Sequence, residues 1–316
     1  MTVLACDLGG TRMKIGVVRN GAVLAQTTEL SNSKDGLAPA LPRLKAAWLR
    51  LLGELNVSLS DCTGISVAFP SLIDAESGRV LAEYGKFADA MSLDLRAWAQ
   101  KELHLPLAIE NDARMALVGE WKHGAGRGSD NVVMITLGTG LGTAAVIEGQ
   151  LLRGKHGQAG VLGGHSTVRY DGRVCGCGNI GCAEAEASTA FLTGLASANA
   201  DFASSRLAHE PRLDFAAIFH HAAADDPCAV KLRDHSLQVW ATLAVNLIHA
   251  YDPEVVILGG GIMASASAIL PAVINHVHQH AHTPWGRVRV VASELGDQAA
   301  LVAGEWLLRE QFPNLK

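Results

Sequence analysis

The sequence predicts an α/β fold built from two copies of one domain. Its 316 residues are enough for two domains, 49% of them are hydrophobic, and apolar strand-like segments alternate with helical ones. A strand and glycine-turn segment near the start also recurs about 130 residues later, a spacing too long for a solenoid. The high hydrophobic fraction and the six cysteines exclude a disordered chain and a small disulfide scaffold.

Each predicted copy begins with a strand, a glycine turn, a second strand and a tight turn. The strands before the glycine turns are 3–8 and 132–137, and the glycine turns are Gly9-Gly10-Thr11 and Gly138-Thr139-Gly140. Asn20-Gly21 then separates two apolar runs, which is a strong hairpin signal. Glu148-Gly149 stands in the corresponding place of the second copy.

The remaining elements follow from hydrophobic spacing and from start and stop signals. Apolar residues at steps of three and four predict a helix over 41–55, and Ser92 is the expected cap of a helix over 93–103. Asp252-Pro253 ends a long helix over 229–251. The other expected elements are strands 63–68, 107–109 and 255–258 and helices 113–123 and 298–310. The expected domains are 1–112 and 113–297, with residues 298–316 packing back on the first.

The glycine turns are candidate phosphate-binding sites. A turn without side chains lets several backbone N–H groups point at one anion, and a matched pair could bind one nucleotide from both sides. Asp7 adds a carboxylate that could hold Mg²⁺ beside the phosphates. Gly259-Gly260-Gly261, at the end of a third strand, leaves room for adenine to approach the backbone. The alternative is that Gly9 and Gly10 only form a hairpin.

Asn111 and Asp112 lie where a buried strand ends and a helix begins, the usual place for ligands in α/β folds. Asp112 could serve as a general base that accepts a hydroxyl proton during phosphoryl transfer, with Asn111 as a substrate anchor. A carboxylate at a helix start is also a common N-cap. The residues alone leave both interpretations open.

Three of the six cysteines fall within eight residues, at Cys175, Cys177 and Cys182, and His165 precedes them. Three thiolates and one imidazole complete a tetrahedral structural zinc site, and the intervening glycines allow a tight loop. A redox pair is the competing interpretation, although the spacing is not C-x-x-C. The isolated Cys6, Cys62 and Cys228 are expected to be packing thiols.

Charge and composition also restrict the partners. The formal net charge of −5 and the scattered basic residues argue against nucleic-acid binding. The sequence shows neither a long apolar run nor a secretion signal, so we expect a cytoplasmic protein without membrane contact.

Together these motifs resemble the ROK family of sugar kinases and repressors. The resemblance is carried by Asp7-Leu8-Gly9-Gly10-Thr11, Glu110-Asn111-Asp112, residues 137–142 and the cysteine series that ends at Glu184. It implies an actin-like (ribonuclease H-like) ATPase fold, with two duplicated α/β domains and a cleft that closes on ATP and sugar. It also implies a homodimer.

The resemblance implies an ATP-dependent kinase that phosphorylates a hydroxyl of a hexose, the C6 hydroxyl being the expected one. It places the catalytic base on Asp112, the zinc ligands on His165 and the three clustered cysteines, and sugar contacts on Asn111, His165 and Glu184. Ser71 is a further expected sugar contact. Phe69-Pro70-Ser71 stands where the family usually carries a Pro-Gly turn, a departure that bears on the identity of the sugar.

One departure bears on the substrate. Many members carry a sugar-binding glutamate in an Ala-Gly-Glu-x-Gly-His run, whereas Val161 stands here and one residue is inserted before His165. A missing charged acceptor removes interactions worth roughly 1.5–3 kcal/mol, which keeps open a glycoside, an amino sugar or a cyclitol as substrate. A non-catalytic sensor is another alternative. We expect no repressor-type helix-turn-helix, because the first strand begins at residue 3.

Overall fold

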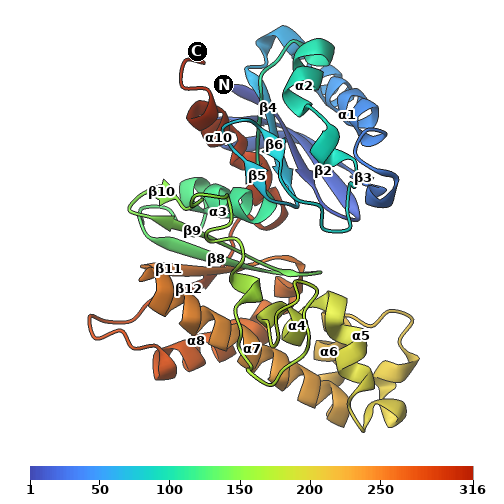
Figure 1. Cartoon of the computed structure of the whole chain (residues 1–316), viewed down its shortest axis with the longest axis vertical. Helices are drawn as coiled ribbons and strands as arrows, with labels where there is room; N and C mark the ends of the chain where they lie inside the picture. Colours follow the sequence, from blue (N-terminus) through green and yellow to red (C-terminus); the bar gives the residue numbers. More distant parts are fainter. Residues whose placement is uncertain (316) are drawn as a thin grey trace. The chain divides into compact units, whose positions relative to one another are not determined.

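The computed structural model describes residues 1–315 and has an α/β architecture with two mixed five-stranded sheets. The chain divides into two compact units, whose elements are labelled in Figure 1. The first unit contains Met1–Arg127, Arg153–Ala159 and the chain from Leu295 onward, and the second contains Gly128–Leu152 and Gly160–Glu294. Each unit has its own hydrophobic core.

The sheet of the first unit has the strand order β3-β2-β1-β4-β7. Its strands are β1 (Thr2–Leu8), β2 (Arg12–Arg19), β3 (Ala22–Leu30), β4 (Gly64–Phe69) and β7 (Leu107–Asn111). β1 is antiparallel to β2 and parallel to β4, which is parallel to β7. Asn20 and Gly21 have φ values of 53° and 71°, as a hairpin with an Asn-Gly turn requires. A short ribbon, β5 (Ile73–Asp74) with β6 (Arg79–Val80), follows β4.

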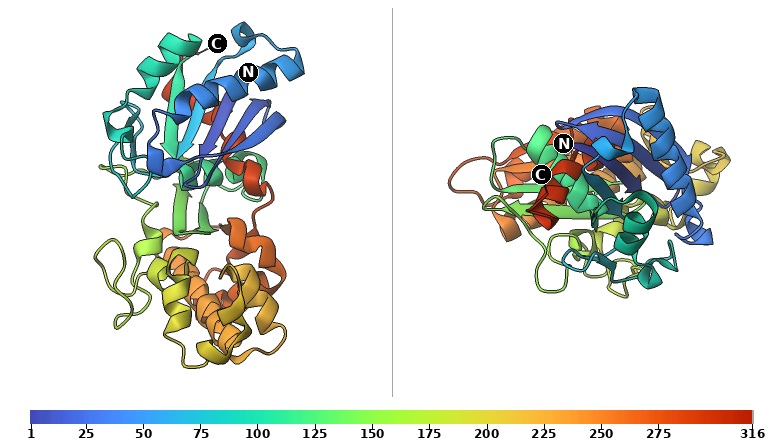
Figure 2. Two further views of the ribbon diagram at one scale, coloured as in Figure 1. Left: turned by 90° about the vertical axis from the view of Figure 1, so that its right-hand side faces the viewer. Right: turned by 90° about the horizontal axis from the view of Figure 1, so that it is seen from above.

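Helices pack on both faces of this sheet (Figures 1 and 2). They are α1 (Ala40–Leu55), α2 (Leu95–Leu103), α3 (Asp112–His123), α9 (Ala299–Val302) and α10 (Gly304–Gln311). Leu4 and Cys6 belong to the core under α1 and α2, whereas Ala5 between them packs against Leu301 of α9. The predicted apolar face of α1 is confirmed, because Leu41, Leu44, Trp48 and Leu51 are buried there and Leu55 packs partly buried against the same core.

Three expectations for the first unit differ from the structure. Asp94, not Ser92, caps α2, because its side chain accepts a hydrogen bond from Ala97 N at 2.9 Å. The closing helix is interrupted at Ala303, between α9 and α10. The expected boundary after residue 112 also differs from the observed division after Arg127, because α3 packs against α9 within the first unit.

The second sheet repeats the first, with the strand order β10-β9-β8-β11-β12. Its strands are β8 (Val132–Leu137), β9 (Leu141–Ile147), β10 (Gln150–Leu151), β11 (Val255–Gly259) and β12 (Arg289–Ala292). The central β8 is antiparallel to β9 and parallel to β11, as β1 is to β2 and β4. Glu148 and Gly149, at φ 50° and 70°, match the turn at Asn20-Gly21. The duplication predicted from the sequence is therefore present in the topology.

The helices of the second unit are α4 (Ala183–Ala187), α5 (Leu192–Ser197), α6 (Phe215–Ala222), α7 (Pro227–Tyr251) and α8 (Ala266–His280). Asp226 caps α7, Pro227 occupies its first turn, and Asp252 ends it in a left-handed conformation before Pro253. Trp240 of α7 is fully buried and donates a hydrogen bond to Ala187 O at 2.9 Å. Across residues 1–315, no helix has the length and apolar character needed to cross a membrane.

Candidate functional site

The site residues predicted in the first unit gather at one edge of its sheet. β1, β4 and β7 are parallel, and their register pairs Phe69 with Asn111. The carboxyl ends of parallel strands meet at one edge of a sheet. Asp7 is the penultimate residue of β1, and Ser71 and Asp112 come just after β4 and β7, so all three lie at neighbouring strand ends. This edge is where ligands bind in open α/β sheets.

Asp112 is the first residue of α3, but Asn111 caps the helix. Asn111 Oδ1 accepts hydrogen bonds from Ala113 N and Arg114 N at 3.1 and 3.2 Å. Asp112 Oδ1 accepts from Ala113 N at 2.8 Å and from Asn111 Nδ2 at 3.1 Å. Both of these hydrogen bonds leave Asp112 Oδ2 unused. One carboxylate oxygen of Asp112 is therefore available for chemistry.

The surroundings of Asp112 adjust its acidity. Burial, and secondarily the nearby carboxylate of Asp7, raise the pKa of Asp112 to about 6. A carboxylate with this pKa is deprotonated at neutral pH and is a stronger base than an ordinary aspartate. The electrostatics therefore favour a general base.

Asn111 uses its whole side-chain amide inside the protein. Besides accepting two backbone hydrogen bonds, it donates from Nδ2 to Ser71 O at 3.1 Å and to Asp112 Oδ1. Asn111 therefore holds Asp112 in place, and its expected contact with a sugar stays a prediction. Ser71 is 5% exposed and its hydroxyl donates to Ala82 O at 2.6 Å.

The first glycine turn is held by a hydrogen bond from the N–H of Gly9 and by hydrogen bonds to the carbonyl group of Gly10. Gly9 N donates to Arg12 O at 2.9 Å, and the hydroxyls of Ser31 and Ser33 donate to Gly10 O at 2.7 and 2.6 Å. Among the described residues, none accepts a hydrogen bond from the N–H of Gly10 or Thr11. Such N–H groups are the donors that a phosphate would use.

Asp7 lies next to this turn and is paired with a lysine. Its Oδ2 is 3.4 Å from Lys14 Nζ, which also lies 2.8 Å from Asp297 Oδ1. Burial raises the pKa of Asp7, although Lys14 opposes this shift. A single carboxylate beside a phosphate-binding turn is the usual protein ligand for Mg²⁺, so the donor fits that ion.

The second and third glycine turns lie side by side in the second unit, because β8 and β11 are neighbours. Gly260, at φ 90°, lies so close to Leu137 O that no side chain would fit. Glu184 Oε2 accepts a hydrogen bond from Leu141 N at 2.9 Å and occupies the space that a side chain at Gly140 would need. Glu184, expected to contact sugar, thus supports the second turn in this structure.

The four predicted zinc ligands come together. The ligand atoms of His165, Cys175, Cys177 and Cys182 all lie within 4.8 Å of one another, and no other such group occurs within residues 1–315. Cys177 Sγ is 3.7 Å from Cys182 Sγ, and His165 Nδ1 is 3.5 Å from Cys175 Sγ. Tetrahedral zinc would separate two sulfurs by about 3.8 Å and a sulfur from a nitrogen by about 3.6 Å. The donor set and its spacing therefore fit zinc.

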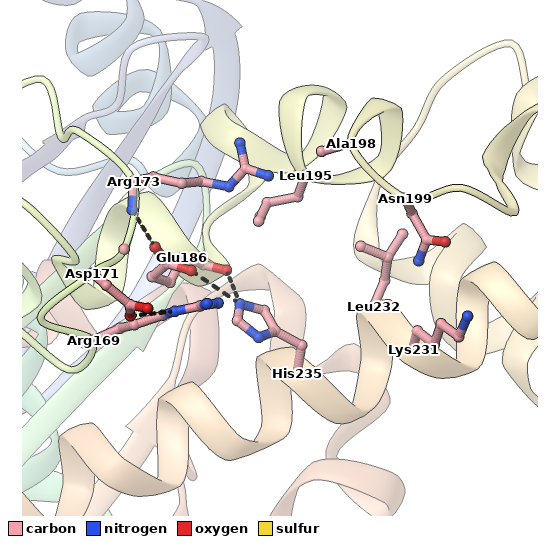
Figure 3. A pocket seen from close by; sticks show the side chains of 11 residues that line it. Arg169, Asp171, Arg173, Glu186, Leu195, Ala198, Asn199, Lys231, Leu232 and His235 are labelled. Atoms are coloured by element: carbon pink, nitrogen blue, oxygen red, sulfur yellow. Dashed lines mark hydrogen bonds and ion pairs between the residues drawn. The ribbon is translucent and has the colours of Figure 1, made fainter.

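A pocket of about 440 Å³ lies beside this cysteine loop, lined by residues of α4, α5 and α7 (Figure 3). Glu186, which is 1% exposed, accepts a hydrogen bond from Arg173 N at 2.6 Å and lies 3.3 Å from His235 Nε2. Its carboxylate therefore fastens the segment before Cys175 to α4 and α7. Glu186 carries no local sequence signal, because its partners are distant in the chain.

The segment 159–165 carries no carboxylate. Val161 is buried, and Gly163–His165 forms a single 3₁₀ turn. Gly164 lies against Leu141 O too closely for any side chain. No acidic group of this segment is thus available to replace the missing glutamate.

A buried ion network is built from Glu110 and Arg114, which flank Asp112 in the sequence. Glu110 and Arg114 are both fully buried and lie 3.1 Å apart, and Glu110 lies 2.6 Å from Arg153, which in turn binds Glu310 at 2.7 Å. Arg114 also donates to the carbonyls of Gly157 and Ala159 at 3.0 and 2.8 Å. The i,i+4 spacing of Glu110 and Arg114 was the only local signal.

Comparisons with known proteins agree with this geometry. A profile described as "ROK family" matches residues 3–311. A glucokinase of Thermotoga maritima is 31% identical over 99% of this chain and 98% of its own. A beta-glucoside kinase of Listeria monocytogenes is 30% identical over 85% of each chain. A solved ROK family glucokinase from Streptomyces griseus, in complex with glucose and AMPPNP, is 28% identical, with a TM-score of 0.81 over 98% of this chain and 100% of that one.

Proposed function

The chain belongs to the ROK family, and from this premise we propose that it is an ATP-dependent kinase that phosphorylates a hexose. The observation that carries the proposal is Asp112, a half-buried carboxylate just after a strand end, with a pKa raised to about 6 and with Oδ2 left unused by the hydrogen bonds from Ala113 and Asn111. Similarity to a glucokinase solved with glucose and AMPPNP supports the same activity.

In the proposed reaction Asp112 Oδ2 accepts the proton of a sugar hydroxyl, which we take to be the primary one at C6. The hydroxyl oxygen forms a bond to the γ-phosphorus while the bond between that phosphorus and the β,γ-bridging oxygen breaks, and ADP leaves. Asn111 keeps Asp112 oriented through its Nδ2 hydrogen bond. The sugar contacts proposed are Ser71, Asn111, His165 and Glu184.

We propose that the nucleotide is bound by the three glycine turns. The N–H groups of Gly10 and Thr11 and the turn around Thr139 would bind phosphate oxygens. Gly259 to Gly261 would accept the adenine. Asp7 would hold Mg²⁺, which when bound neutralises charge on the phosphates.

We propose that His165, Cys175, Cys177 and Cys182 hold a structural zinc ion. The separations of their donor atoms support this assignment. A closed tetrahedral site leaves no position for substrate, so the metal would hold the loop rather than take part in the reaction. The homodimer implied by the family resemblance is also a proposal, which light scattering of the purified protein tests.

A hexose substituted at the anomeric carbon is a second candidate substrate. Val161 removes the acidic side chain that many family members carry at this point, so a free anomeric hydroxyl has lost a hydrogen-bond acceptor. The beta-glucoside kinase that is 30% identical supports this candidate.

The experiment is an ADP-release assay with ATP and Mg²⁺ over free hexoses, N-acetylhexosamines, cyclitols and β-glucosides. We expect turnover with at least one hexose or hexoside, and the ratio of kcat/KM for glucose and methyl β-glucoside decides between the two candidates. Nucleotide binding without turnover on any sugar would contradict the kinase and favour a sensor.

A further inference from the structure

Lys86 lies in the first unit on a segment that is tied to the first glycine turn. Its neighbour Phe87 donates a backbone hydrogen bond to Ser33 O at 2.8 Å, and the Ser33 hydroxyl donates to Gly10 O. Phe87 is 1% exposed, and its ring centroid lies 5.5 Å from that of Phe69 at the end of β4. The backbone at Lys86 is therefore held in position, although its side chain is only partly buried.

The Lys86 side chain crosses Gly10. A Cβ atom at Gly10 would lie 2.7 Å from Lys86 Cε and 3.3 Å from Lys86 Nζ, so the lysine occupies the space that the glycine leaves. Within residues 1–315, the ammonium group has no hydrogen bond and no ion pair. Lys14, the other lysine at this edge, is already paired with Asp7 and Asp297.

The charge of Lys86 also reaches the candidate base. Lys86 lowers the pKa of Asp112, opposing the upward shift caused by burial and by Asp7. Lys86 therefore lies against the phosphate-binding turn and within electrostatic range of the carboxylate that would deprotonate the sugar. An in-line transfer passes the γ-phosphoryl group between those two places.

We propose that Lys86 is a further catalytic residue, whose ammonium group binds an oxygen of the γ-phosphoryl group as that group is transferred. This rests on the proposed kinase activity. The sugar oxygen forms the new bond to phosphorus, the bond to the β,γ-bridging oxygen breaks, and the hydroxyl proton goes to Asp112. Lys86 remains protonated throughout and stabilises the charge on the equatorial oxygens, which is largest in the transition state.

The test compares Lys86→Met, Lys86→Arg and the control Lys101→Met, a lysine whose side chain is 82% exposed on α2. We expect Lys86→Met to lower kcat by roughly 10²–10³-fold, the usual loss of one preorganised donor, with the sugar KM changed less than about threefold. Lys86→Arg should recover at least a tenth of the activity, and Lys101→Met should match the wild type. Circular dichroism and titration of each variant with AMPPNP establish that it is folded and binds nucleotide.

Full activity of Lys86→Met would overturn the proposal, as would a rise in sugar KM with kcat unchanged, since Lys86 would then bind the sugar and not the phosphoryl group. An equal loss of kcat in Lys86→Met and Lys86→Arg would also overturn the proposal, because the positive charge of arginine would then restore no activity. A wild-type protein without activity on any sugar refutes the proposed function itself and is distinguishable from all these outcomes.

Discussion

Replacing Asp112 by Asn should make the protein more stable at alkaline pH. Burial and the charge of Asp7 raise the pKa of Asp112 from 3.8 to about 6, so the folded state holds the charged carboxylate unfavourably. A shift of about two pH units corresponds to about 3 kcal/mol between the two protonation states. The asparagine removes this charge and keeps an oxygen for the hydrogen bond from Ala113.

The size of the stabilisation depends on pH. Above pH 6 Asp112 is ionised in both the folded and the unfolded state, and the buried charge lowers the free energy of unfolding of the wild type by the full amount of about 3 kcal/mol. As pH falls from 6 to below about 4, Asp112 is protonated in the folded state before it is protonated in the unfolded state, and the destabilisation disappears. For a unit of about 150 residues we therefore expect a Tm increase of roughly 6–12 °C at pH 8 that shrinks toward zero near pH 4.

Differential scanning calorimetry of the wild type, Asp112→Asn and the control Asp35→Asn, an exposed aspartate, measures this at pH 8 and pH 4. The control should melt with the wild type at both pH values. If Asp112→Asn is no more stable than the wild type at pH 8, or is stabilised equally at pH 4, the account of the environment of Asp112 is wrong.

Three further predictions concern the supports of the site. Cys177→Ser should lose bound zinc by elemental analysis and lower the melting temperature of the second unit, whereas Cys62→Ser should keep one zinc per chain. Arg114→Met should lower the free energy of unfolding of the first unit by about 3–5 kcal/mol in urea, because it leaves Glu110 without one partner of a buried pair. The control Arg309→Met, at an exposed arginine, should change the free energy of unfolding by less than about 0.5 kcal/mol. Equal effects of the two substitutions would refute a stabilising role of the ion network. Gly140→Ala should collide with Glu184 and weaken AMPPNP binding in calorimetric titration, and unchanged binding would count against a nucleotide role for that turn.

Features with a local signal were predictable from the sequence. The duplication was evident because glycine turns and tight turns recur in order, and the zinc ligands because they lie within a short loop. β12 was not predicted, since a four-residue strand carries little periodicity, and the packing of α3 on α9 joins parts of the chain that are far apart.

Some residues of the candidate site were likewise predictable from the sequence, and others were not. The sequence identified Asp112 but could not decide between base and cap, because that depends on Asn111 taking the capping hydrogen bonds. Lys86 had no local signal at all, since its position matters only through its contact with Gly10. Glu186 likewise depends on Arg173 in the cysteine loop and on His235 of α7, which approach it only in the folded chain.

The most direct test of the central claim measures transfer of the γ-phosphate from labelled ATP to the best sugar of the panel, by the wild type and by Asp112→Asn, together with the Kd of that sugar. A general base predicts a loss of at least about 10²-fold in kcat for Asp112→Asn, with the sugar Kd changed only a few-fold. An Asp112→Asn variant that kept most of the wild-type activity would contradict the assignment of Asp112 as the base.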